Sequence, residues 1–546
     1  MTVEAEARVA PLAERTVVHM LQRGAALRPD QLAVVDAVTS VTYAQLLELT
    51  ASVGGALREL GVQRAEPVLL MMDNSLDHVL AWFGAAWIGA VEVPLNTASM
   101  PPQIAYIADD CQAQVLVIEA GYLERVVAVA DQMPQLRHVI VRGEPTVALP
   151  ASWTVHRMPE LRTHAAVAPV ELGPQDVCGI MYTSGTTGSP KGVLVTHAQT
   201  YGRNGPLGVG SPAAGDITLV VLPIYHVLGQ CRGLYNGLIA LGTVVLREGF
   251  SASAFWDLCR QYGVTYTCIV GVMAEYLLAQ EPRPDDADNP VRRIALGTTI
   301  KDVAAFRARF GIDECYVSYG MTEAGGVLVG PAEKDGCGYL REDFEACLVD
   351  ANDMPVPDGE VGELLIRPKE PWTVMIGYYR NPEATAEKWR NLWLHTGDLM
   401  HRTPEGRYIF HGRMSERIRS KGENIAPASI EDQLAGHPAL RDCAVVGVAP
   451  QDDHAAQGDQ DVMLAIVPSD PQRFDPVEIL MFLAERVPYF AVPRYVRTMG
   501  ELPRTESTRR VQRSQIAALG AEGAWDRVEH GVVVERGGRV RVNERA

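Results

Sequence analysis

Basic residues are scarce in this sequence relative to acidic ones. Lys and Arg number 49 against 67 Asp and Glu, so the 546-residue chain has a formal net charge of −18. Such an excess of negative charge argues against a nucleic-acid backbone or an anionic membrane as the main partner. It still allows a small anionic ligand, such as a nucleotide, to bind in a locally basic pocket.

Long apolar runs and paired cysteines are also missing. The longest apolar run, Val79 to Val91, is shorter than the roughly 20 residues that a membrane-spanning helix needs. Acidic Glu4, Glu6 and Glu14 interrupt any signal-peptide core near the N-terminus. The 9 cysteines are scattered without a C-x-x-C pair, which argues against a structural zinc site and is typical of reduced thiols. We therefore expect a cytoplasmic protein with no membrane partner.

Between about residues 30 and 325, short β-branched runs alternate with helical patterns. This alternation indicates an α/β fold with mostly parallel sheets in a large N-terminal domain. The predicted strands are Pro67 to Met72, Val91 to Leu95, Val115 to Ile118, His138 to Val141, Thr218 to Leu222, Thr243 to Leu246 and Thr265 to Val270.

The second half of the chain has a different predicted secondary-structure pattern. Turn signals at Asp358-Gly359 and Glu405-Gly406 predict a small β subdomain over about residues 340–412. A shorter α+β pattern follows, so we expect an N-terminal domain over 1–412 and a small C-terminal domain over 413–546. Its predicted elements are a helix N-capped by Ser429, strands at Cys443 to Val448 and Val462 to Val467, a helix at Pro476 to Val487, and a terminal hairpin around Gly537-Gly538.

Residues Tyr182 to Val193 read Tyr-Thr-Ser-Gly-Thr-Thr-Gly-Ser-Pro-Lys-Gly-Val and follow a mostly apolar run. Glycine allows backbone N–H groups to turn inward, the hydroxyls add donors, and Lys191 adds a positive charge, so this loop is suited to bind phosphates. It is not a Walker A loop, because Lys191 is followed by Gly192. The alternative is an ordinary Gly/Ser turn.

Four further segments follow this loop in the sequence: Leu222-Pro-Ile-Tyr-His226, Tyr319-Gly-Met-Thr-Glu323, His395-Thr-Gly-Asp398 and Tyr408-Ile-Phe-His-Gly-Arg413. In this order, the five segments resemble the adenylate-forming enzymes, which include acyl-CoA synthetases, peptide-synthetase adenylation domains and firefly luciferase. The resemblance extends from about Val41-Thr-Tyr43 to about Arg513 and is nearest to the acyl-CoA ligases. It implies ATP/AMP, Mg²⁺ and coenzyme A as cofactors, and a mobile C-terminal domain with a hinge near 413–416.

The resemblance assigns roles around the phosphates to residues of two motifs. Thr183 to Lys191 would bind the leaving pyrophosphate, with Lys191 as the charged end of the loop. Glu323 would hold Mg²⁺, Thr322 would contact the α-phosphate, and Tyr319 would lie against the adenine. Each of these residues, taken alone, could equally have a packing or capping role.

The resemblance also assigns residues to the ribose of the nucleotide and to the hinge. One carboxylate offers two acceptor oxygens, so Asp398 is suited to bind both ribose hydroxyls, and Arg413 would contact the ribose just before the hinge. The implied nucleotide-binding residues are Thr183, Ser184, Gly185, Thr186, Thr187, Gly188, Lys191, Gly297, Thr298, Thr299, Tyr319, Gly320, Met321, Thr322, Asp398, Phe410 and Arg413. The implied catalytic residues are Lys191, Thr322, Glu323 and Arg413, joined by Arg509 or Arg510.

The acyl group and coenzyme A have their own implied residues. The family has an aromatic gate where Tyr225 and His226 stand, and a glycine-containing loop near the pantetheine where Gly422 stands. An aromatic core residue and a plain glycine turn are the respective alternatives. The acyl candidates are Tyr225, His226, Gly233, Tyr235, Met273 and Gly320, and the coenzyme A candidates are His226, Ser420, Lys421, Gly422 and Glu423.

The sequence departs from the family pattern near its C-terminus. The family carries a lysine after Leu-Pro-x-Thr that reaches the substrate carboxylate and the α-phosphate. Counting from Leu502 puts Arg509 at that place, whereas counting back from Arg513 puts Arg510 there. Arginine is a wide planar fork rather than a compact ammonium, and the glycine before the lysine is replaced by Thr508 or Arg509. A second departure is Ser415, where relatives carry a hinge Asp or Lys.

These features predict an acyl-CoA ligase that forms its thioester through an acyl-adenylate. Because one well-placed charge is worth about 10²- to 10³-fold in rate, the lost lysine predicts impaired adenylation. The enzyme would then join coenzyme A to an acyl-adenylate made by a separate adenylating enzyme. The alternatives are a fully competent ATP-dependent synthetase, a ligase that loads a carrier protein, and a silent relative that only binds the acid or its adenylate.

Overall fold

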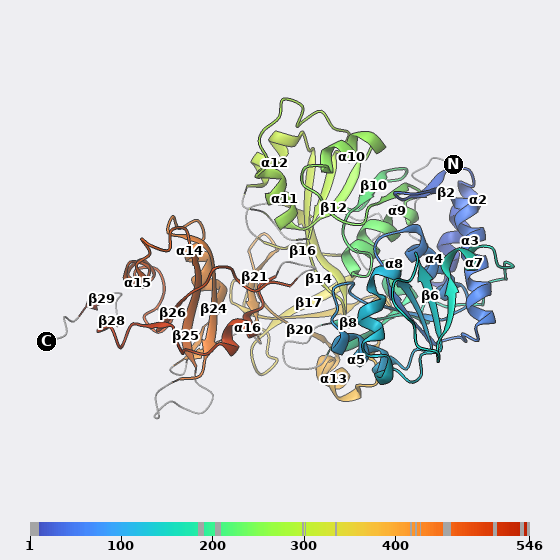
Figure 1. The fold of residues 1–546 in the computed structure, drawn as a ribbon. Coiled ribbons are helices and arrows are strands. Elements are labelled where there is room, and N and C mark those ends of the chain that lie inside the picture. Colours follow the sequence, from blue (N-terminus) through green and yellow to red (C-terminus); the bar gives the residue numbers. More distant parts are fainter. Residues whose placement is uncertain are drawn as a thin grey trace. The chain divides into compact units, whose positions relative to one another are not determined.

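The computed structural model of the chain describes residues 10–183, 190–202, 209–297, 300, 302–332, 336–414, 418–420, 423–425, 427–450, 460–505, 510–534 and 540–542. The chain divides into two compact units (Figure 1). Unit 1 comprises Met1–Ala346, Ile366–Leu394 and Gly406–Tyr408, and unit 2 comprises Cys347–Leu365, His395–Glu405 and Ile409–Ala546. The predicted domain boundary and hinge at 413–416 stay predictions.

Unit 1 contains an eight-stranded sheet of order β19-β9-β8-β4-β3-β5-β6-β7. Its central strands run parallel to one another, whereas β9 is antiparallel to β8 and β19 is antiparallel to β9. The strands are β3 (Pro67–Met71), β4 (Val91–Pro94), β5 (Val115–Glu119), β6 (His138–Arg142), β7 (Thr154–Arg157), β8 (Val177–Thr183), β9 (Lys191–Thr196) and β19 (Gly377–Tyr378).

A second sheet in unit 1 has the order β16-β15-β14-β13-β12-β10-β11-β1-β2. It is parallel from β14 to β1, with antiparallel strands at both ends of this run. The strands are β1 (Leu32–Val35), β2 (Ser40–Thr42), β10 (Ile217–Val220), β11 (Thr243–Leu246), β12 (Tyr266–Ile269), β13 (Arg293–Leu296), β14 (Glu314–Met321), β15 (Gly325–Pro331) and β16 (Gly338–Leu340). The prediction of an α/β fold with mostly parallel sheets is confirmed.

Helices cover the faces of both sheets. One core joins α2, α3 and α4 to both sheets, a second joins α5 and α6 to the other face of the first sheet, and a third joins α10, α11 and α12 to the second sheet (Figure 1). The helices of unit 1 are η1 (Leu12–Glu14), α2 (Val17–Leu27), α3 (Tyr43–Glu59), α4 (Leu76–Trp87), α5 (Pro101–Cys111), η2 (Ala120–Tyr122), α6 (Leu123–Val127), η3 (Ala130–Gln132), α7 (Met158–Arg162), α8 (His197–Gly202), η4 (Leu228–Tyr235), α9 (Asn236–Ile239), α10 (Phe255–Tyr262), α11 (Gly271–Leu278), α12 (Val303–Phe310), α13 (Pro382–Lys388) and η5 (Arg390–Leu392).

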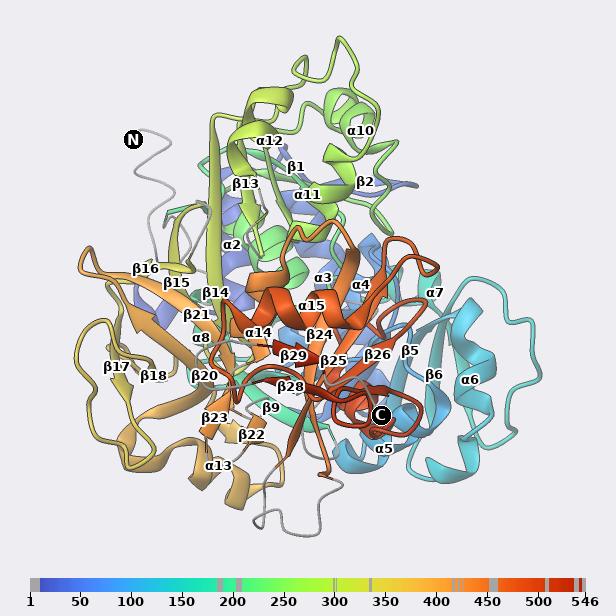
Figure 2. The ribbon, with the colours of Figure 1, turned by 90° about the vertical axis from the view of Figure 1, so that its left-hand side faces the viewer.

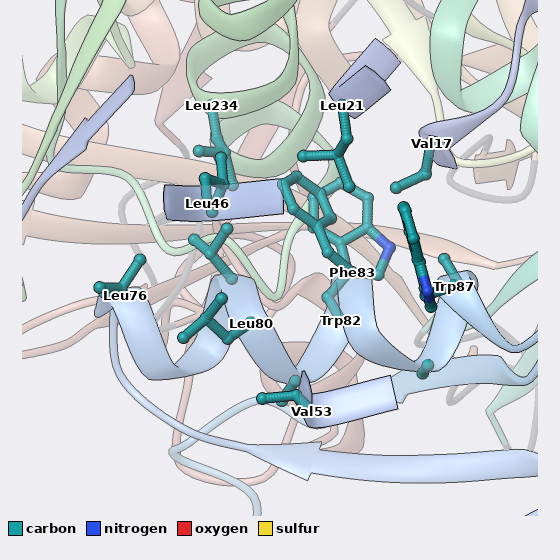
Figure 3. Close-up of a cluster of buried hydrophobic side chains, with 14 of the residues drawn as sticks. Val17, Leu21, Leu46, Val53, Leu76, Leu80, Trp82, Phe83, Trp87 and Leu234 are labelled. Atoms are coloured by element: carbon teal, nitrogen blue, oxygen red, sulfur yellow. The ribbon is translucent and has the colours of Figure 1, made fainter. Parts of the chain in front are cut away.

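Helix α4 accounts for most of the longest apolar run of the sequence. Every residue of α4 is buried, and Ser75 caps its first turn by accepting a hydrogen bond from the backbone N–H of His78. Figure 3 shows Trp82 and Phe83 of α4 packed with Leu46 and other apolar side chains. A Cβ on Gly84 would lie 2.6 Å from a methyl group of Val53, so only glycine permits α3 and α4 to approach this closely. Within the described residues, no helix is long and apolar enough to cross a membrane.

Unit 2 contains most of a hairpin-rich β region. Its strands are β17 (Phe344–Val349), β18 (Gly362–Pro368), β20 (Leu394–Arg402) and β21 (Arg407–Arg413), which neighbour one another in that order. Gly359 and Gly406, at the two predicted turns, have φ values of 90° and 86°. Glycine adopts such positive φ values more readily than other residues, which is why these two glycines are a reliable signal of turns.

The C-terminal part of unit 2 is an α+β fold around a four-stranded sheet of order β24-β25-β26-β27. Helix α15 lies on this sheet, with Ile479 and Leu480 in one core with Val445 and Leu464 (Figure 2). The elements are β22 (Ile418–Ser420), β23 (Glu423–Ile425), α14 (Pro427–Leu434), β24 (Leu440–Val448), β25 (Asp461–Pro468), α15 (Pro476–Ala484), β26 (Tyr495–Thr498), α16 (Arg513–Ala518), β27 (Trp525–Asp526), β28 (Val532–Val534) and β29 (Val540–Val542).

One predicted boundary in this region is wrong. Helix α14 begins at Pro427, two residues before Ser429, so Ser429 lies inside the first turn and is not the N-cap. Proline is favoured in the first turn because its missing N–H would have no partner there. The predicted terminal hairpin is confirmed, because β28 and β29 pair antiparallel, while Gly537-Gly538 lies outside the described residues.

Candidate functional site

The predicted phosphate loop connects two paired strands of the first sheet. Strands β8 and β9 are antiparallel neighbours, and Thr183 pairs directly with Lys191 in their register. The Thr183 hydroxyl also donates to the Lys191 carbonyl at 3.4 Å. Ser184, Gly185, Thr186, Thr187 and Gly188 lie outside the described residues. The strand pairing therefore holds the two ends of the loop side by side.

Lys191, Tyr378 and Glu323 form a connected group in unit 1. The Lys191 Nζ lies 5.4 Å from the centroid of the Tyr378 ring, and the Tyr378 hydroxyl donates to Glu323 Oε1 at 2.8 Å. Burial, together with the nearby Glu323 carboxylate, raises the pKa of Tyr378 well above its ordinary value, so the hydroxyl keeps its proton and remains a donor. Strand β19, which carries Tyr378, pairs with β9 and so brings the ring to Lys191.

The backbone around Glu323 is fixed by a buried amide. Gln199 of α8 donates from Nε2 to the carbonyls of Thr322 and Glu323, at 3.2 and 3.0 Å. The backbone N–H of Met375 also donates to the Glu323 carbonyl at 2.8 Å. These contacts hold the Thr322-Glu323 turn without using the Glu323 carboxylate. Among the described residues, Tyr378 is the hydrogen-bond partner given for that carboxylate, through Oε1.

The residue after β13 and the next-to-last residue of β14 are glycines at positions with no room for a side chain. A Cβ on Gly297 would lie 2.8 Å from Leu228, and a Cβ on Gly320 would lie 2.2 Å from the Gly325 carbonyl. A bulge in the β14–β15 pairing falls between Tyr319 and Gly320, just before Met321. Because β13 and β14 are parallel neighbours, these glycines lie at one edge of the sheet, where α/β folds bind ligands. Thr298 and Thr299 lie outside the described residues.

Tyr225 and His226 follow β10 and lie against each other, with ring centroids 4.9 Å apart. Burial lowers the pKa of His226 to about 4, so this imidazole is neutral near pH 7. Its Nε2 is buried and has no hydrogen-bond partner among the described residues. A neutral ring nitrogen in this position is available to a ligand.

The remaining acyl candidates fall into two places. Met273 of α11 packs, half-buried, against a small cluster that includes Tyr266 and Cys268. Tyr235, in contrast, is fully buried in the main core, with its ring centroid 5.8 Å from that of Trp82. A Cβ on Gly233 would meet Val220 at 3.0 Å. The role of Gly233 and Tyr235 in acyl binding stays a prediction.

In unit 2, Asp398 is held in place through its own motif. Thr396 Oγ1 accepts from the Asp398 N–H at 3.0 Å and donates to the Leu364 carbonyl at 2.7 Å. Glu363 accepts from the Gly397 N–H and contacts His395 Nδ1, both at 2.9 Å.

The Asp398 side chain itself is only 3% exposed. Its Oδ1 lies 3.1 Å from Arg413 Nε, so the two residues form an ion pair. Phe410, on the same strand as Arg413, is 41% exposed. The structure thus brings together two of the predicted ribose residues.

Unit 2 also holds a set of metal-ligand types. Asp353, Glu363 and His395 offer ligand atoms that all lie within 4.8 Å of one another. Glu363 is already committed to Gly397 and His395, so we assign this set to the support of the Thr-Gly-Asp turn. The predicted Mg²⁺ residue, Glu323, belongs to unit 1.

The predicted coenzyme A loop joins β22 and β23. Ser420 pairs with Glu423 in their antiparallel register, and Ser420 is 4% exposed. Lys421 and Gly422, like Ser415 near the hinge, lie outside the described residues. The pairing of Ser420 with Glu423 is compatible with a plain glycine turn as well as with a coenzyme A loop.

The segment that departs from the family pattern has a closed base. The Thr505 N–H donates to the Arg510 carbonyl at 2.8 Å, and the Arg510 N–H donates to Thr505 Oγ1 at 3.0 Å. Arg504 pairs with Asp442 at 2.6 Å, which ties the base to β24. The Arg510 backbone is thus part of the base, while Arg509 lies outside the described residues. Arg509 and Arg510 both stay predicted counterparts of the family lysine.

Three supporting residues were missed from the sequence: Gln199, Glu363 and Tyr378. Each contacts a motif residue that is distant in the sequence, so no local pattern identifies it. Glu363 and Tyr378 follow directly after Gly362 and Gly377, which is a weak signal of a close approach. Gln199 has no such signal.

Comparisons with known proteins place these features in one family. The model of the AMP-binding enzyme family matches residues 21–379, and the model of the AMP-binding enzyme C-terminal domain matches residues 429–509. A crotonobetaine/carnitine–CoA ligase of Salmonella typhi is 30% identical over 493 residues, which cover 87% of this chain and 93% of that protein.

Solved structures agree with this result. A benzoate CoA ligase from Burkholderia xenovorans LB400 has a TM-score of 0.78 and 25% identity, covering 92% of this chain and 99% of its own. An anthranilate CoA ligase in complex with anthranoyl-AMP has a TM-score of 0.78 and 24% identity, covering 95% and 99% of the two chains. The latter similarity establishes the fold alone.

Proposed function

Because this chain belongs to the AMP-binding enzyme family and is an acid–thiol ligase of the acyl-CoA ligase type, we propose that it makes an acyl-CoA thioester through an acyl-adenylate. In the first step a carboxylate oxygen attacks the α-phosphorus of ATP and pyrophosphate leaves. In the second step the sulfur of coenzyme A attacks the acyl carbon and AMP leaves.

The observation that carries the proposal is the connected group of Lys191, Tyr378 and Glu323. Lys191 supplies positive charge at the end of the phosphate loop, and Glu323 supplies a carboxylate whose orientation Tyr378 fixes. Hard oxygen ligands suit Mg²⁺, and Glu323 keeps one oxygen beyond its bond with Tyr378, so the residues present fit this ion. When bound, Mg²⁺ neutralises phosphate charge.

Further roles are proposed for the remaining motif residues. Thr322 contacts the α-phosphate, and Tyr319 and Gly297 form the adenine site at the strand ends. Asp398 accepts hydrogen bonds from the ribose hydroxyls, and its pairing with Arg413 supports this role because it fixes the carboxylate. His226, neutral and with a free ring nitrogen, is proposed to contact the acyl or pantetheine end.

We further propose that the adenylation step is impaired. Arg509 or Arg510 takes the place of the family lysine, and a planar guanidinium is not a conservative replacement where two ligands share one compact ammonium. A misplaced charge of this kind costs about 10²- to 10³-fold in rate. The enzyme would then depend on a separate enzyme, in the cytoplasm, that supplies the acyl-adenylate.

Two assays on the purified protein test these proposals. ATP–pyrophosphate exchange with a panel of carboxylic acids should remain near background, whereas the matching synthetic acyl-adenylates plus coenzyme A should give thioester. Brisk exchange would overturn the impaired-adenylation proposal and favour the fully competent synthetase. Failure of every adenylate to give thioester would overturn the ligase proposal and favour a silent relative.

A carrier protein is the alternative acyl acceptor. Supplying the same adenylates with either coenzyme A or a phosphopantetheinylated carrier protein distinguishes a coenzyme A ligase from a carrier-loading ligase. The proposal expects product with coenzyme A. Product with the carrier alone would assign the enzyme to carrier loading.

A further inference from the structure

Lys191 lies at the far end of the β8–β9 hairpin. Strand β4 pairs with β8 at Gly179, and β19 pairs with β9 at Val193 and Leu194, so neither of these pairings reaches Lys191. A two-stranded hairpin is only marginally stable by itself. The position of Lys191 therefore depends on contacts from other elements.

Helix α5 supplies such contacts to both strands of the hairpin. The Tyr106 hydroxyl donates to the Pro190 carbonyl at 3.0 Å. The Tyr182 hydroxyl donates to Asp110 Oδ2. Tyr106 and Asp110 are four residues apart in α5, so their side chains lie on the same face of the helix. One face of α5 thus holds the end of β8 and the start of β9.

The glycine after Lys191 permits the contact of Tyr182 with α5. Tyr182 pairs with Gly192 in the β8–β9 register, and a Cβ on Gly192 would lie 3.1 Å from Cζ of the Tyr182 ring. The ring therefore passes over bare backbone. Burial and the hydrogen bond to Asp110 raise the pKa of Tyr182, so its hydroxyl keeps its proton and remains a donor. Because Pro190 and Gly192 flank Lys191, α5 holds the chain on both sides of this lysine.

The same helix also contacts the segment that carries Tyr378. Arg380, just after β19, donates from Nη1 to the Asp110 carbonyl at 3.0 Å. Its φ of 50° is uncommon for a residue other than glycine, and the bond to α5 helps to hold this turn. Helix α5 is therefore bonded to both segments that meet where Lys191 lies against the Tyr378 ring.

Helix α5 is itself firmly held. Ile104, Ile107 and Ala108 lie in the core that the helix shares with the first sheet, and the Tyr182 ring packs against this core. The side chain of Gln135 donates from Nε2 to the Ala108 carbonyl at 2.7 Å. A helix fixed in this way can determine where the hairpin lies.

We propose that Tyr106 and Asp110 are positioning residues that place Lys191 for the pyrophosphate end of ATP. The proposal rests on the proposed function, in which Lys191 binds the leaving pyrophosphate. Asp110 is unsuited to be a phosphate ligand itself, because its negative charge would repel the phosphate. Its effect reaches the phosphates through Tyr182 and Lys191, since a chain that is already fixed loses less conformational freedom when the ligand binds.

Isothermal titration of the full chain with MgATP, with pyrophosphate plus Mg²⁺ and with AMP tests the proposal without requiring adenylation. Asp110→Ala and Tyr182→Phe remove the same hydrogen bond from its two sides. Each should raise the Kd for MgATP and for pyrophosphate by about 5- to 10-fold. The Kd for AMP should stay within about twofold, because AMP lacks the pyrophosphate that Lys191 is proposed to bind.

Further variants make the test specific. Asp110→Asn keeps an oxygen that accepts from Tyr182 and should restore the Kd for MgATP to within about threefold of the wild type. Asp109→Ala is the matched control, because it removes the same charge from the same helix at an exposed residue that is bonded to Gln112. Tyr106→Phe, which removes a bond between neutral groups, should raise the Kd by about two- to fivefold. Combining Asp110→Ala with Tyr182→Phe should add little to either change alone, because both remove one bond.

The outcomes separate this proposal from the proposed function. An unchanged Kd for MgATP in both Asp110→Ala and Tyr182→Phe would overturn the inference alone, and so would an equal rise in the Kd for AMP, which indicates a merely structural role. A rise in Asp109→Ala equal to that in Asp110→Ala would assign the effect to charge and also overturn it. If Asp110→Ala does not fold, Tyr182→Phe, which keeps the ring, gives the same test. Failure of the wild type to bind MgATP and pyrophosphate would instead overturn the proposed nucleotide site, and this inference with it.

Discussion

Replacing Tyr378 by Phe should weaken the binding of MgATP. The substitution removes one oxygen atom and keeps the ring beneath Lys191, so the cation–ring contact at 5.4 Å is preserved. What is lost is the hydrogen bond of 2.8 Å to Glu323, a carboxylate in a residue that is only 8% exposed. The carboxylate then loses the contact that fixes its orientation.

The size of the effect follows from the charge of the acceptor. A hydrogen bond to a charged group contributes about 1.5–3 kcal/mol, which corresponds to a 10- to 150-fold change in an equilibrium constant. We expect the Kd for MgATP to rise by up to this factor, because the bond also exists in the free protein and only the lost orientation of the carboxylate affects binding. The buried carboxylate oxygen without a partner should also lower the free energy of unfolding by about 1–3 kcal/mol.

Isothermal titration of the wild type and the variant, with MgATP and with ATP plus a chelator, measures the effect without requiring adenylation. Tyr379→Phe is the matched control, because this adjacent tyrosine is partly buried and has no hydrogen bond to Glu323 among the described residues. The chelated nucleotide should bind both variants and the wild type with similar affinity. If Tyr378→Phe binds MgATP as tightly as the wild type, Glu323 is not oriented by Tyr378 for the metal and the reasoning is wrong.

Further predictions concern pH, the C-terminal loop and the ribose residue. Burial lowers the pKa of His78 and His197 to about 4, so between that value and 6.5 the unfolded chain takes up protons that the folded chain does not. Acidification from about pH 7.5 to about pH 5 should therefore lower the free energy of unfolding, measured by denaturant titration, by about 2 kcal/mol for each histidine. His197→Gln should reduce the dependence of this free energy on pH. An unchanged dependence in the variant would contradict the prediction. One of the two double substitutions, Thr508→Gly with Arg509→Lys or Arg509→Gly with Arg510→Lys, should raise ATP–pyrophosphate exchange about 10²-fold. No rise in either would exclude the lost lysine as the cause of a slow first step. Asp398→Asn should raise the Kd for ATP more than that for coenzyme A, measured by isothermal titration, because the proposed ribose-binding carboxylate contacts the nucleotide. An equal rise would argue against the ribose role.

The parallel sheets could be predicted closely from the sequence. Predicted strands such as Val115 to Ile118 and Thr243 to Leu246 agree with β5 and β11 to within a residue, because buried parallel strands read as continuous β-branched runs. The N-cap at Ser429 was wrong because the proline two residues earlier already starts the helix.

The candidate site could be predicted in part. The motif residues Lys191, Glu323 and Asp398 stand in recognisable segments, whereas Gln199 and Tyr378 act on them from parts of the chain that only the fold brings near. Tyr106 and Asp110 would also have been missed, since polar residues on one face of a helix are typical of a solvated surface until their contacts are known. The contacts between residues that are distant in the sequence are therefore the part of the site that requires a structure.

The short strand β27 has a consequence for handling the protein. Trp525 and Asp526 pair with Val496 and Tyr495 of β26, and Arg494 is bonded to Asp526, so β27 covers the outer side of β26. A shortened chain that stopped after α16 would leave the hydrogen-bonding groups of β26 open, and uncovered strand edges promote aggregation. Expression trials should therefore keep the residues beyond 518.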